Sequence, residues 1–316
     1  MALRLATRGS ALALTQARWV AERLGGAELI EASSDGEPGD KSRFVRGVER
    51  ALLAGEAEVG VHSAKDLPGA DMPLGLEIAA VPVREDPADA WIGPGTSLQD
   101  VPEGARVGTA SLRRRAQLLA ARPDLRVREL HGNVDTRLGK LADGDLDAIV
   151  LAAAGLRRLG REGEISFRLD RDAMVPAPGQ GALALQIREG DEETARALAA
   201  IGEDRALREL TAERAAVAPL GASCATPVGI HARVDGESLA LTAFVGLPDG
   251  SEWIRDALEA DAAEPLEAGT ELAERLIAAG AADLIARAET LAADGPISGN
   301  MGTKSARRPR RPGEDA

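Results

Sequence analysis

Apolar residues near the start of the chain recur first with the period of a strand and then with that of a helix. Ser10 suits the position that caps the first helix, and Gly25 suits the position that ends it. The order β-α-β-α-β predicts a parallel or mixed sheet covered by helices. The expected elements are strand 3–7, helix 10–26, strand 28–33, helix 43–56 and a strand that runs into a loop at 57–68.

A second unit of the same kind is expected after a proline-rich passage at 79–95, which we interpret as a crossover between domains. A Pro-Gly loop and an apolar strand at 174–189 indicate a second crossover that returns to the first unit. Two crossovers between two α/β units predict a double hinge around a cleft, as in bilobed binding proteins. The elements of the second unit are strand 105–109, helix 111–123, strand 126–130, loop 131–137, helix 136–144, strand 146–152 and helix 153–160.

The remainder of the chain predicts a small α+β domain followed by a tail. The tail holds almost no apolar residues and much Pro, Gly, Ser and Arg, so we expect it to be disordered. The expected elements are helix 203–216, strands 226–236, 238–250 and 252–260, and one helix at about 265–290. The predicted domains are 1–82 with 180–200, 86–176, 203–290 and the tail 291–316.

Composition narrows the class of protein. The 316 residues are 44% hydrophobic and 28% charged but only 2% aromatic, so the cores must consist mainly of Ala, Val, Leu and Ile. No apolar run reaches the length of a membrane span, and the N-terminus lacks the pattern of a signal peptide. The single cysteine, Cys224, excludes an internal disulfide framework and a multi-cysteine zinc site. We expect a cytoplasmic protein without a metal.

Charge is distributed unevenly. The net charge of −13 argues against a general nucleic-acid binder, yet residues 104–160 hold 11 Lys and Arg against 6 Asp and Glu. A basic region in an acidic protein indicates a local anionic ligand.

Three arginines, 113–115, fall in the first turn of the expected helix 111–123, where the helix dipole disfavours cations unless an anion lies in front. Thr109 and Ser111 precede them in a turn suited to binding an anion. Arg137 and the pair 157–158 follow later strands of the same unit, and such loops converge on one sheet edge. The pattern predicts a site for a ligand with several carboxylates. A merely solvated basic face is the alternative.

Two further positions suggest chemistry. Lys65 and Asp66 end a strand in "VHSAKDLP", where a carboxylate can serve as an acid–base group, although the two could form an ordinary surface ion pair. His62 in the same segment suits a structural role better than that of a base. Cys224 lies in the loop "PLGASCATPVG" and is either a small buried residue or a nucleophile or covalent anchor.

Seven motifs in order across residues 5–230 together resemble the porphobilinogen deaminase (hydroxymethylbilane synthase) family. Each motif is modest alone, but their order over more than 200 residues is specific. The motifs are "ATRGSALAL", "VHSAKDLP", "SLRRRAQLL", "GNVDTRL", "AGLRRLG", "PAPGQGALA" and "CATPVG".

The resemblance implies a fold and a reaction. The fold would be α/β, with two periplasmic-binding-protein-like domains, a double crossover and a small α+β C-terminal domain. Cys224 would hold a dipyrromethane cofactor by a thioether. Four porphobilinogen units would be added to it stepwise with release of ammonia, and hydrolysis would free the linear hydroxymethylbilane. The enzyme would be a monomeric transferase without nucleic-acid or membrane partners, and its product would pass to uroporphyrinogen-III synthase.

The resemblance also assigns roles to residues. Asp66 would be catalytic: it would help protonate the leaving amine and stabilise cationic charge. The acetate and propionate groups of the pyrroles would meet the basic groups. The expected cofactor- and substrate-binding residues are Arg8, Ser63, Lys65, Thr109, Ser111, Arg113, Arg114, His131, Arg137, Arg158 and Gln180.

The chain departs from the family pattern in places. His131 stands where the family typically has arginine, which would weaken one carboxylate contact unless nearby carboxylates favour the protonated imidazole. The segment at 33–43 is shorter than the usual loop, and the Arg-rich tail has no assigned role.

One alternative is a bilobed dicarboxylate-binding protein without catalysis, which would need neither Cys224 nor the third domain. Another is a transferase that uses Cys224 as nucleophile, for which only His231 is near in sequence.

Overall fold

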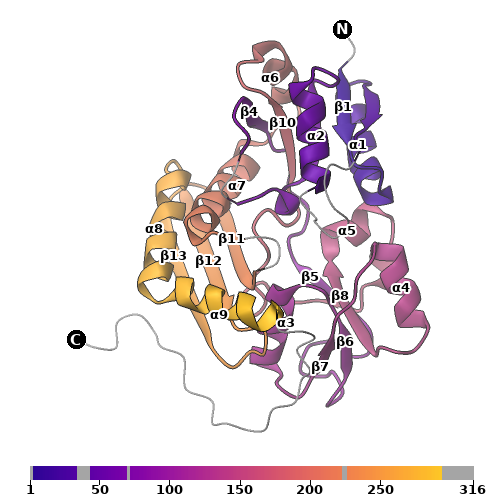
Figure 1. The fold of residues 1–316 in the computed structure, drawn as a ribbon, viewed down its shortest axis with the longest axis vertical. Coiled ribbons are helices and arrows are strands. Elements are labelled where there is room, and N and C mark those ends of the chain that lie inside the picture. Colours follow the sequence, from indigo (N-terminus) through magenta and orange to yellow (C-terminus); the bar gives the residue numbers. More distant parts are fainter. Residues whose placement is uncertain (1–2, 34–42, 70–71, 223–225, 294–316) are drawn as a thin grey trace.

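The computed structural model describes residues 3–33, 43–69, 72–222 and 226–293, and Figure 1 shows them as two α/β lobes beside a third, smaller unit. No helix in these ranges is long and apolar enough to cross a membrane. Within the same ranges no group of three or more His, Cys, Asp or Glu side chains is arranged to hold a metal ion.

The first lobe is a mixed five-stranded sheet in the order β2-β1-β3-β10-β4. β1 is parallel to β2 and β3, whereas β10 is antiparallel to β3 and β4. The Ser10 side chain accepts a hydrogen bond from the Ala13 amide and caps α1, as predicted. The elements are β1 (Arg4–Thr7), α1 (Ala11–Arg23), β2 (Glu28–Glu31), α2 (Arg43–Leu53), β3 (Val59–Ser63), a 3-10 turn (Ala64–Asp66), β4 (Leu76–Ala80), β10 (Leu183–Arg188) and α6 (Glu192–Ala199).

The second lobe repeats this plan in the order β7-β6-β8-β5-β9. β6 is parallel to β7 and β8, and β5 is antiparallel to β8 and β9. The elements are β5 (Asp89–Ile92), β6 (Arg106–Gly108), α3 (Leu112–Ala121), β7 (Arg126–Arg128), α4 (Val134–Ala142), β8 (Ala148–Ala152), α5 (Ala153–Arg158), a 3-10 turn (Glu162–Glu164) and β9 (Phe167–Arg168).

The crossovers do more than connect the lobes, because each carries the fourth strand of a sheet. The return crossover carries β10 into the first sheet, as the pattern predicted. The interpretation of 79–95 as a plain crossover was incomplete, since the segment contains β5, which is buried along its whole length. A four-residue strand that is buried on both faces shows no alternation, and the prolines on either side of it obscured it.

The third unit is an antiparallel meander, β11-β12-β13, packed against three helices. Its elements are α7 (Asp204–Val217), a 3-10 turn (Ala218–Leu220), β11 (Val228–Asp235), β12 (Ser238–Gly246), β13 (Trp253–Asp261), α8 (Pro265–Ala278) and α9 (Ala281–Ala293). The single helix predicted at 265–290 is wrong: Gly280, at φ +98°, separates α8 from α9. α9 also extends three residues into the predicted tail, and residues 294–316 lie outside the described residues.

The third unit contacts both lobes. Ala116 of α3 and Val175 form a small apolar cluster with Phe244 and Trp253, whose rings stack. On the side of the first lobe, Leu210 of α7 belongs to an apolar cluster with Val45 of α2 and Ala184 of β10. Arg84, in the crossover that precedes β5, forms an ion pair with Glu213 of α7. The space between the lobes therefore has a third wall.

Candidate active site

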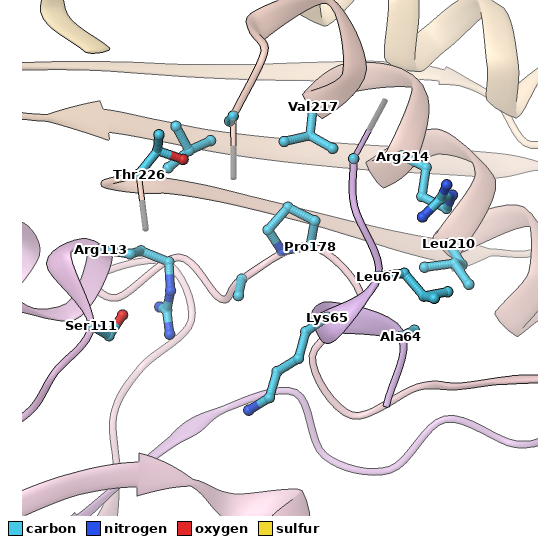
Figure 2. Close-up of a pocket in the computed structure, with 14 residues that line it drawn as sticks. Ala64, Lys65, Leu67, Ser111, Arg113, Pro178, Leu210, Arg214, Val217 and Thr226 are labelled. Carbon is cyan, nitrogen blue, oxygen red and sulfur yellow. The ribbon is translucent and has the colours of Figure 1, made fainter. Parts of the chain in front are cut away.

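A cavity of about 80 Å³ lies where the three units meet. Its walls come from the 3-10 turn after β3, the start of α3, the return crossover at 177–178, and α7 with the segment that leads into β11. Figure 2 shows Lys65, Arg113 and Arg214 on different elements around it. The turn after β3 and the start of α3 thus meet a wall from the third unit, whereas the other two basic loops of the second unit, at Arg137 and at 157–158, contribute no residue to the lining.

The anion in front of α3 is part of the chain itself. Asp89, at the start of β5, is fully buried between Arg113 and Arg114. Its oxygens lie 2.7 and 3.1 Å from the Arg113 guanidinium and 2.9 Å from Nε of Arg114. Burial opposes ionisation, but the two arginines hold the pKa of Asp89 well below its usual value. One buried carboxylate thus holds two guanidiniums in place. The three side chains together keep a net positive charge.

The third arginine of the run serves another purpose. Arg115 is buried and donates to the carbonyl oxygens of Val127 and Pro248 at 3.1 and 3.2 Å. Pro248 belongs to the turn between β12 and β13. Arg115 therefore joins α3 to the third unit rather than lining the cavity.

The expected catalytic aspartate lies at the end of the 3-10 turn after β3. Asp66 Oδ2 is 3.1 Å from Nη1 of Arg8, and the side chains of Arg8 and Asp66 are 32% and 41% exposed. Lys65, the residue before it, lines the cavity. Burial and the nearby Arg114 lower the pKa of Lys65 to about 8 despite the opposing effect of Asp66. The turn therefore brings a solvent-accessible carboxylate next to an ammonium close to its titration range.

Two more of the predicted arginines have no carboxylate bound to them in the described part of the chain. Arg137 is partly buried, its pKa is lowered by burial and by Arg114, and its buried Nε has no hydrogen-bond partner. Arg158 donates to the Gly181 carbonyl at 2.7 Å, and burial lowers its pKa to about 10. Desolvated guanidiniums of this kind are suited to an anionic ligand.

The hydroxyl residues near α3 and β3 mostly bond within the chain. Ser111 caps α3 by accepting from the Arg114 amide and also lines the cavity. Thr109 is buried, and its Oγ1 accepts from the Ser111 amide. Ser63 bonds to the Gln16 amide group at 3.0 Å.

Of the eleven predicted binding residues, Lys65, Ser111 and Arg113 line the cavity, and the other eight, among them His131 and Gln180, do not. His131 is exposed, and its Nε2 is 2.7 Å from a carboxylate oxygen of Glu129. Gln180 is almost fully buried, and its amide nitrogen bonds to the Pro87 carbonyl and to Asp89. The structure thus brings His131 close to a carboxylate, whereas Gln180 supports Asp89 from behind. Cys224 lies outside the described residues, as does most of the shortened loop at 33–43.

The sequence did not predict Asp89, the ion pair of Arg84 with Glu213, or Gln16, all of which lie in this region. Asp89 was hidden in a proline-rich stretch, and Arg84 and Glu213 are too far apart in sequence to be paired by inspection. Gln16 left a detectable signal, because it is a polar residue on the buried face of α1.

The arrangement defines a class of protein. Two α/β lobes joined by a double crossover, with a third unit against them, enclose a cavity bordered by cations from different elements. Such a site is built to hold a ligand that carries several carboxylates.

Comparison with known proteins identifies the family. Residues 3–196 match "Porphobilinogen deaminase, dipyromethane cofactor binding domain", and residues 207–278 match "Porphobilinogen deaminase, C-terminal domain". The chain is 45% identical over 293 residues to the porphobilinogen deaminase of Thermus thermophilus, covering 89% of this chain and 97% of that protein. It is 45% identical over 298 residues to that of Deinococcus radiodurans, covering 88% and 96%. The chain therefore belongs to the porphobilinogen deaminase family.

Among solved structures, a TRAP periplasmic solute binding protein from Desulfovibrio salexigens aligns with 65% of this chain and 73% of its own. The two are 12% identical, with a TM-score of 0.39.

Family membership establishes the reaction. The chain is a transferase of porphyrin and heme biosynthesis that uses a dipyrromethane cofactor. It condenses four porphobilinogen units head to tail, releases ammonia at each step and hydrolyses the product to hydroxymethylbilane. The alternative of a binding protein without catalysis is not favoured, because the family match extends through the third unit.

Proposed function

We propose that this chain performs the deaminase reaction with Asp66 as the catalytic residue and Cys224 as the attachment point of the dipyrromethane. The observation that carries the proposal is the cavity that Lys65 and Arg113 share with Ala222 and Thr226. The described residues nearest to Cys224 on either side, Ala222 and Thr226, both line this cavity.

The groups at the cavity fit a dipyrromethane. When bound, this cofactor supplies the pyrrole end to which each new unit is joined, and its acetate and propionate side chains are anionic. Lys65 and Arg113 line the cavity and can pair with such carboxylates. Arg137 is not among the lining residues, but its buried Nε is a donor without a partner in the described chain. Ser111 can add a hydroxyl hydrogen bond.

Asp66 is suited to the charged part of the reaction. Loss of ammonia from porphobilinogen leaves positive charge on the ring system, and a carboxylate close to it stabilises that charge. Arg8, 3.1 Å away, holds the carboxylate in place. The exposure of Asp66 lets it exchange protons with water between cycles and help protonate the leaving amine.

The attachment role predicts a mass difference. Purified wild-type protein should exceed its chain mass by two linked pyrrole units, and Cys224→Ser should show the bare chain mass. If the wild-type mass stays bare after incubation with porphobilinogen, the attachment role is refuted.

The role of Asp66 predicts a loss of turnover with the cofactor in place. Asp66→Asn should retain the added mass and lose about 10²- to 10⁴-fold in kcat, the usual range for an acid–base group. Asp135→Asn is a matched control, because Asp135 also forms an exposed ion pair with an arginine, Arg161, at 2.8 Å. Wild-type turnover in a cofactor-loaded Asp66→Asn protein would contradict the assignment.

Four wider proposals accompany these roles. The enzyme works as a monomer, supported by a cavity whose walls all come from one chain. It works in the reducing cytoplasm, which keeps the thiol of its one cysteine available. Its freed product passes to uroporphyrinogen-III synthase. Its domains are 1–82 with 180–200, 86–176 and 203–290, a division supported by the membership of the three sheets.

A further inference from the structure

Arg214 is the one charged residue that the third unit contributes to the described wall of the cavity. It lies in the last turn of α7, on the same wall as Val217, Ala222 and Thr226. Figure 2 shows Arg214 and Arg113 entering the region from opposite sides. No motif in the sequence drew attention to Arg214, because it stands in an ordinary helix.

The other arginines of α7 have acidic partners along the helix. Arg205 lies 3.1 Å from Glu209, and Arg208 lies 2.6 Å from Asp204. Arg214 has Leu210 four residues before it and Ala218 four residues after it, so the helix offers it no carboxylate at this spacing. The difference singles out Arg214 among the three.

Its charge is also unmatched from outside the helix. Nη1 donates to the Pro68 carbonyl at 3.0 Å, and Arg214 forms no ion pair with a carboxylate in the described chain. Burial lowers the pKa of Arg214, and no charged group in the described ranges opposes this effect. A guanidinium carries five N–H donors, so one bond to Pro68 leaves most of them for a ligand.

We propose that Arg214 is a carboxylate subsite that binds an acidic side chain of the dipyrromethane close to its point of attachment. The inference rests on the proposed function, since it takes Cys224 as that point. The wall that carries Arg214 also carries Ala222 and Thr226, which flank residues 223–225. A carboxylate bound there would satisfy a partly desolvated cation on the side of the cavity opposite Arg113.

A purely structural role makes a different prediction. The bond to Pro68 could fasten the segment after Asp66 to α7, in which case removal of the side chain would destabilise the protein with or without the cofactor. If Arg214 is instead a subsite, removal of its side chain would lower the stability only of the protein that carries the cofactor, here called the loaded protein. Comparison of apoprotein and loaded protein therefore separates the two roles.

The test follows the mass of apoprotein over time during incubation with porphobilinogen. Arg214→Gln should gain the cofactor mass about 10- to 100-fold more slowly than wild type, the loss expected for one hydrogen-bonded charge. Arg214→Lys, which keeps the charge but not the bidentate geometry, should fall between them. Arg208→Gln on the same helix should match wild type.

Thermal unfolding provides the second readout. Attachment of the cofactor should raise the midpoint temperature of unfolding more in wild type than in Arg214→Gln, while the two apoproteins should unfold at similar temperatures. Equal loading rates, or an equal loss of stability in apoprotein and loaded protein, would overturn the subsite. If Arg214→Gln does not fold, the loading rate of Arg214→Lys decides. If wild type itself gains no mass, or if Cys224→Ser does gain it, the proposed attachment has failed instead.

Discussion

Removal of the charge on Asp89 tests how the basic site is held together. Asp89→Asn keeps the size of the side chain but leaves Arg113 and Arg114 without their shared carboxylate. The Asp89 side chain is fully buried, and the two arginine side chains are only 4% and 7% exposed. Breaking a buried ion pair by removal of one partner costs about 3–5 kcal/mol, because the other charge stays desolvated.

The free energy of unfolding, measured with urea at pH 7, should therefore fall by about 3–5 kcal/mol in Asp89→Asn. A suitable control is Asp147→Asn, because the Asp147–Arg106 pair is similarly short at 2.7 Å but over one-third exposed on each side. The control should lose far less, since water solvates the arginine that remains. Equal losses in the two variants would refute the argument that burial increases the contribution of the Asp89 ion pairs to stability.

The pH dependence provides a second check with a definite sign. The pKa of Asp89 is lower in the folded protein than in the unfolded chain, where it is about 3.9. Its contribution is therefore fully present above that value and is lost as the pH falls further towards the folded-state pKa. The difference between wild type and Asp89→Asn should stay constant from pH 6 to 8 and shrink below about pH 4. A difference that grows on acidification would contradict the assignment.

Three further predictions concern other parts of the molecule. Because the pKa of Lys65 is lowered to about 8 and carboxylate binding needs the ammonium form, kcat/KM should fall above that pH in wild type but not in Lys65→Arg; parallel pH profiles would count against this role. His131→Arg should leave KM unchanged, since His131 is exposed and bonded to Glu129; a lower KM would show that this position reaches the substrate. Gly250→Ala and Gly160→Ala both place a side chain at a φ near +70°, which costs about 1–2 kcal/mol. Gly250→Ala should lose about 1–3 kcal/mol more in urea unfolding, because its Cβ would meet the backbone of α3 whereas Gly160 faces open space; equal losses would argue against that close approach.

Local patterns predicted the parts of the fold that depend on neighbours in sequence. The alternation of strands and helices in the lobes, the cap at Ser10 and the return of β10 to the first sheet are all confirmed. The strand β5 was missed because full burial removes the alternation that reveals a strand. The break at Gly280 was missed because apolar positions recur at helical spacing on both sides of it.

For the candidate site too, the sequence predicted some features and missed others. The residue types near Lys65 and at the start of α3 indicated an anionic ligand, and these residues do meet at one cavity. The run 113–115 nevertheless does not act as a unit. Arg113 and Arg114 share Asp89, whereas Arg115 points to the turn at Pro248. Successive residues of a helix face different directions, so adjacency in sequence does not imply a shared partner.

By itself, the sequence determined the order of the elements, the basic character of the second lobe and the family resemblance, because these depend on residue types and on spacing along the chain. Only the tertiary structure decided which charges are paired. Asp89 reaches its arginines across the sheet, and Glu213 reaches Arg84 from 129 positions away. The structure also places Arg214 in a cavity wall with no carboxylate paired to it among the described residues. Electrostatic energies depend on distance and burial, and both are set when separate segments pack together.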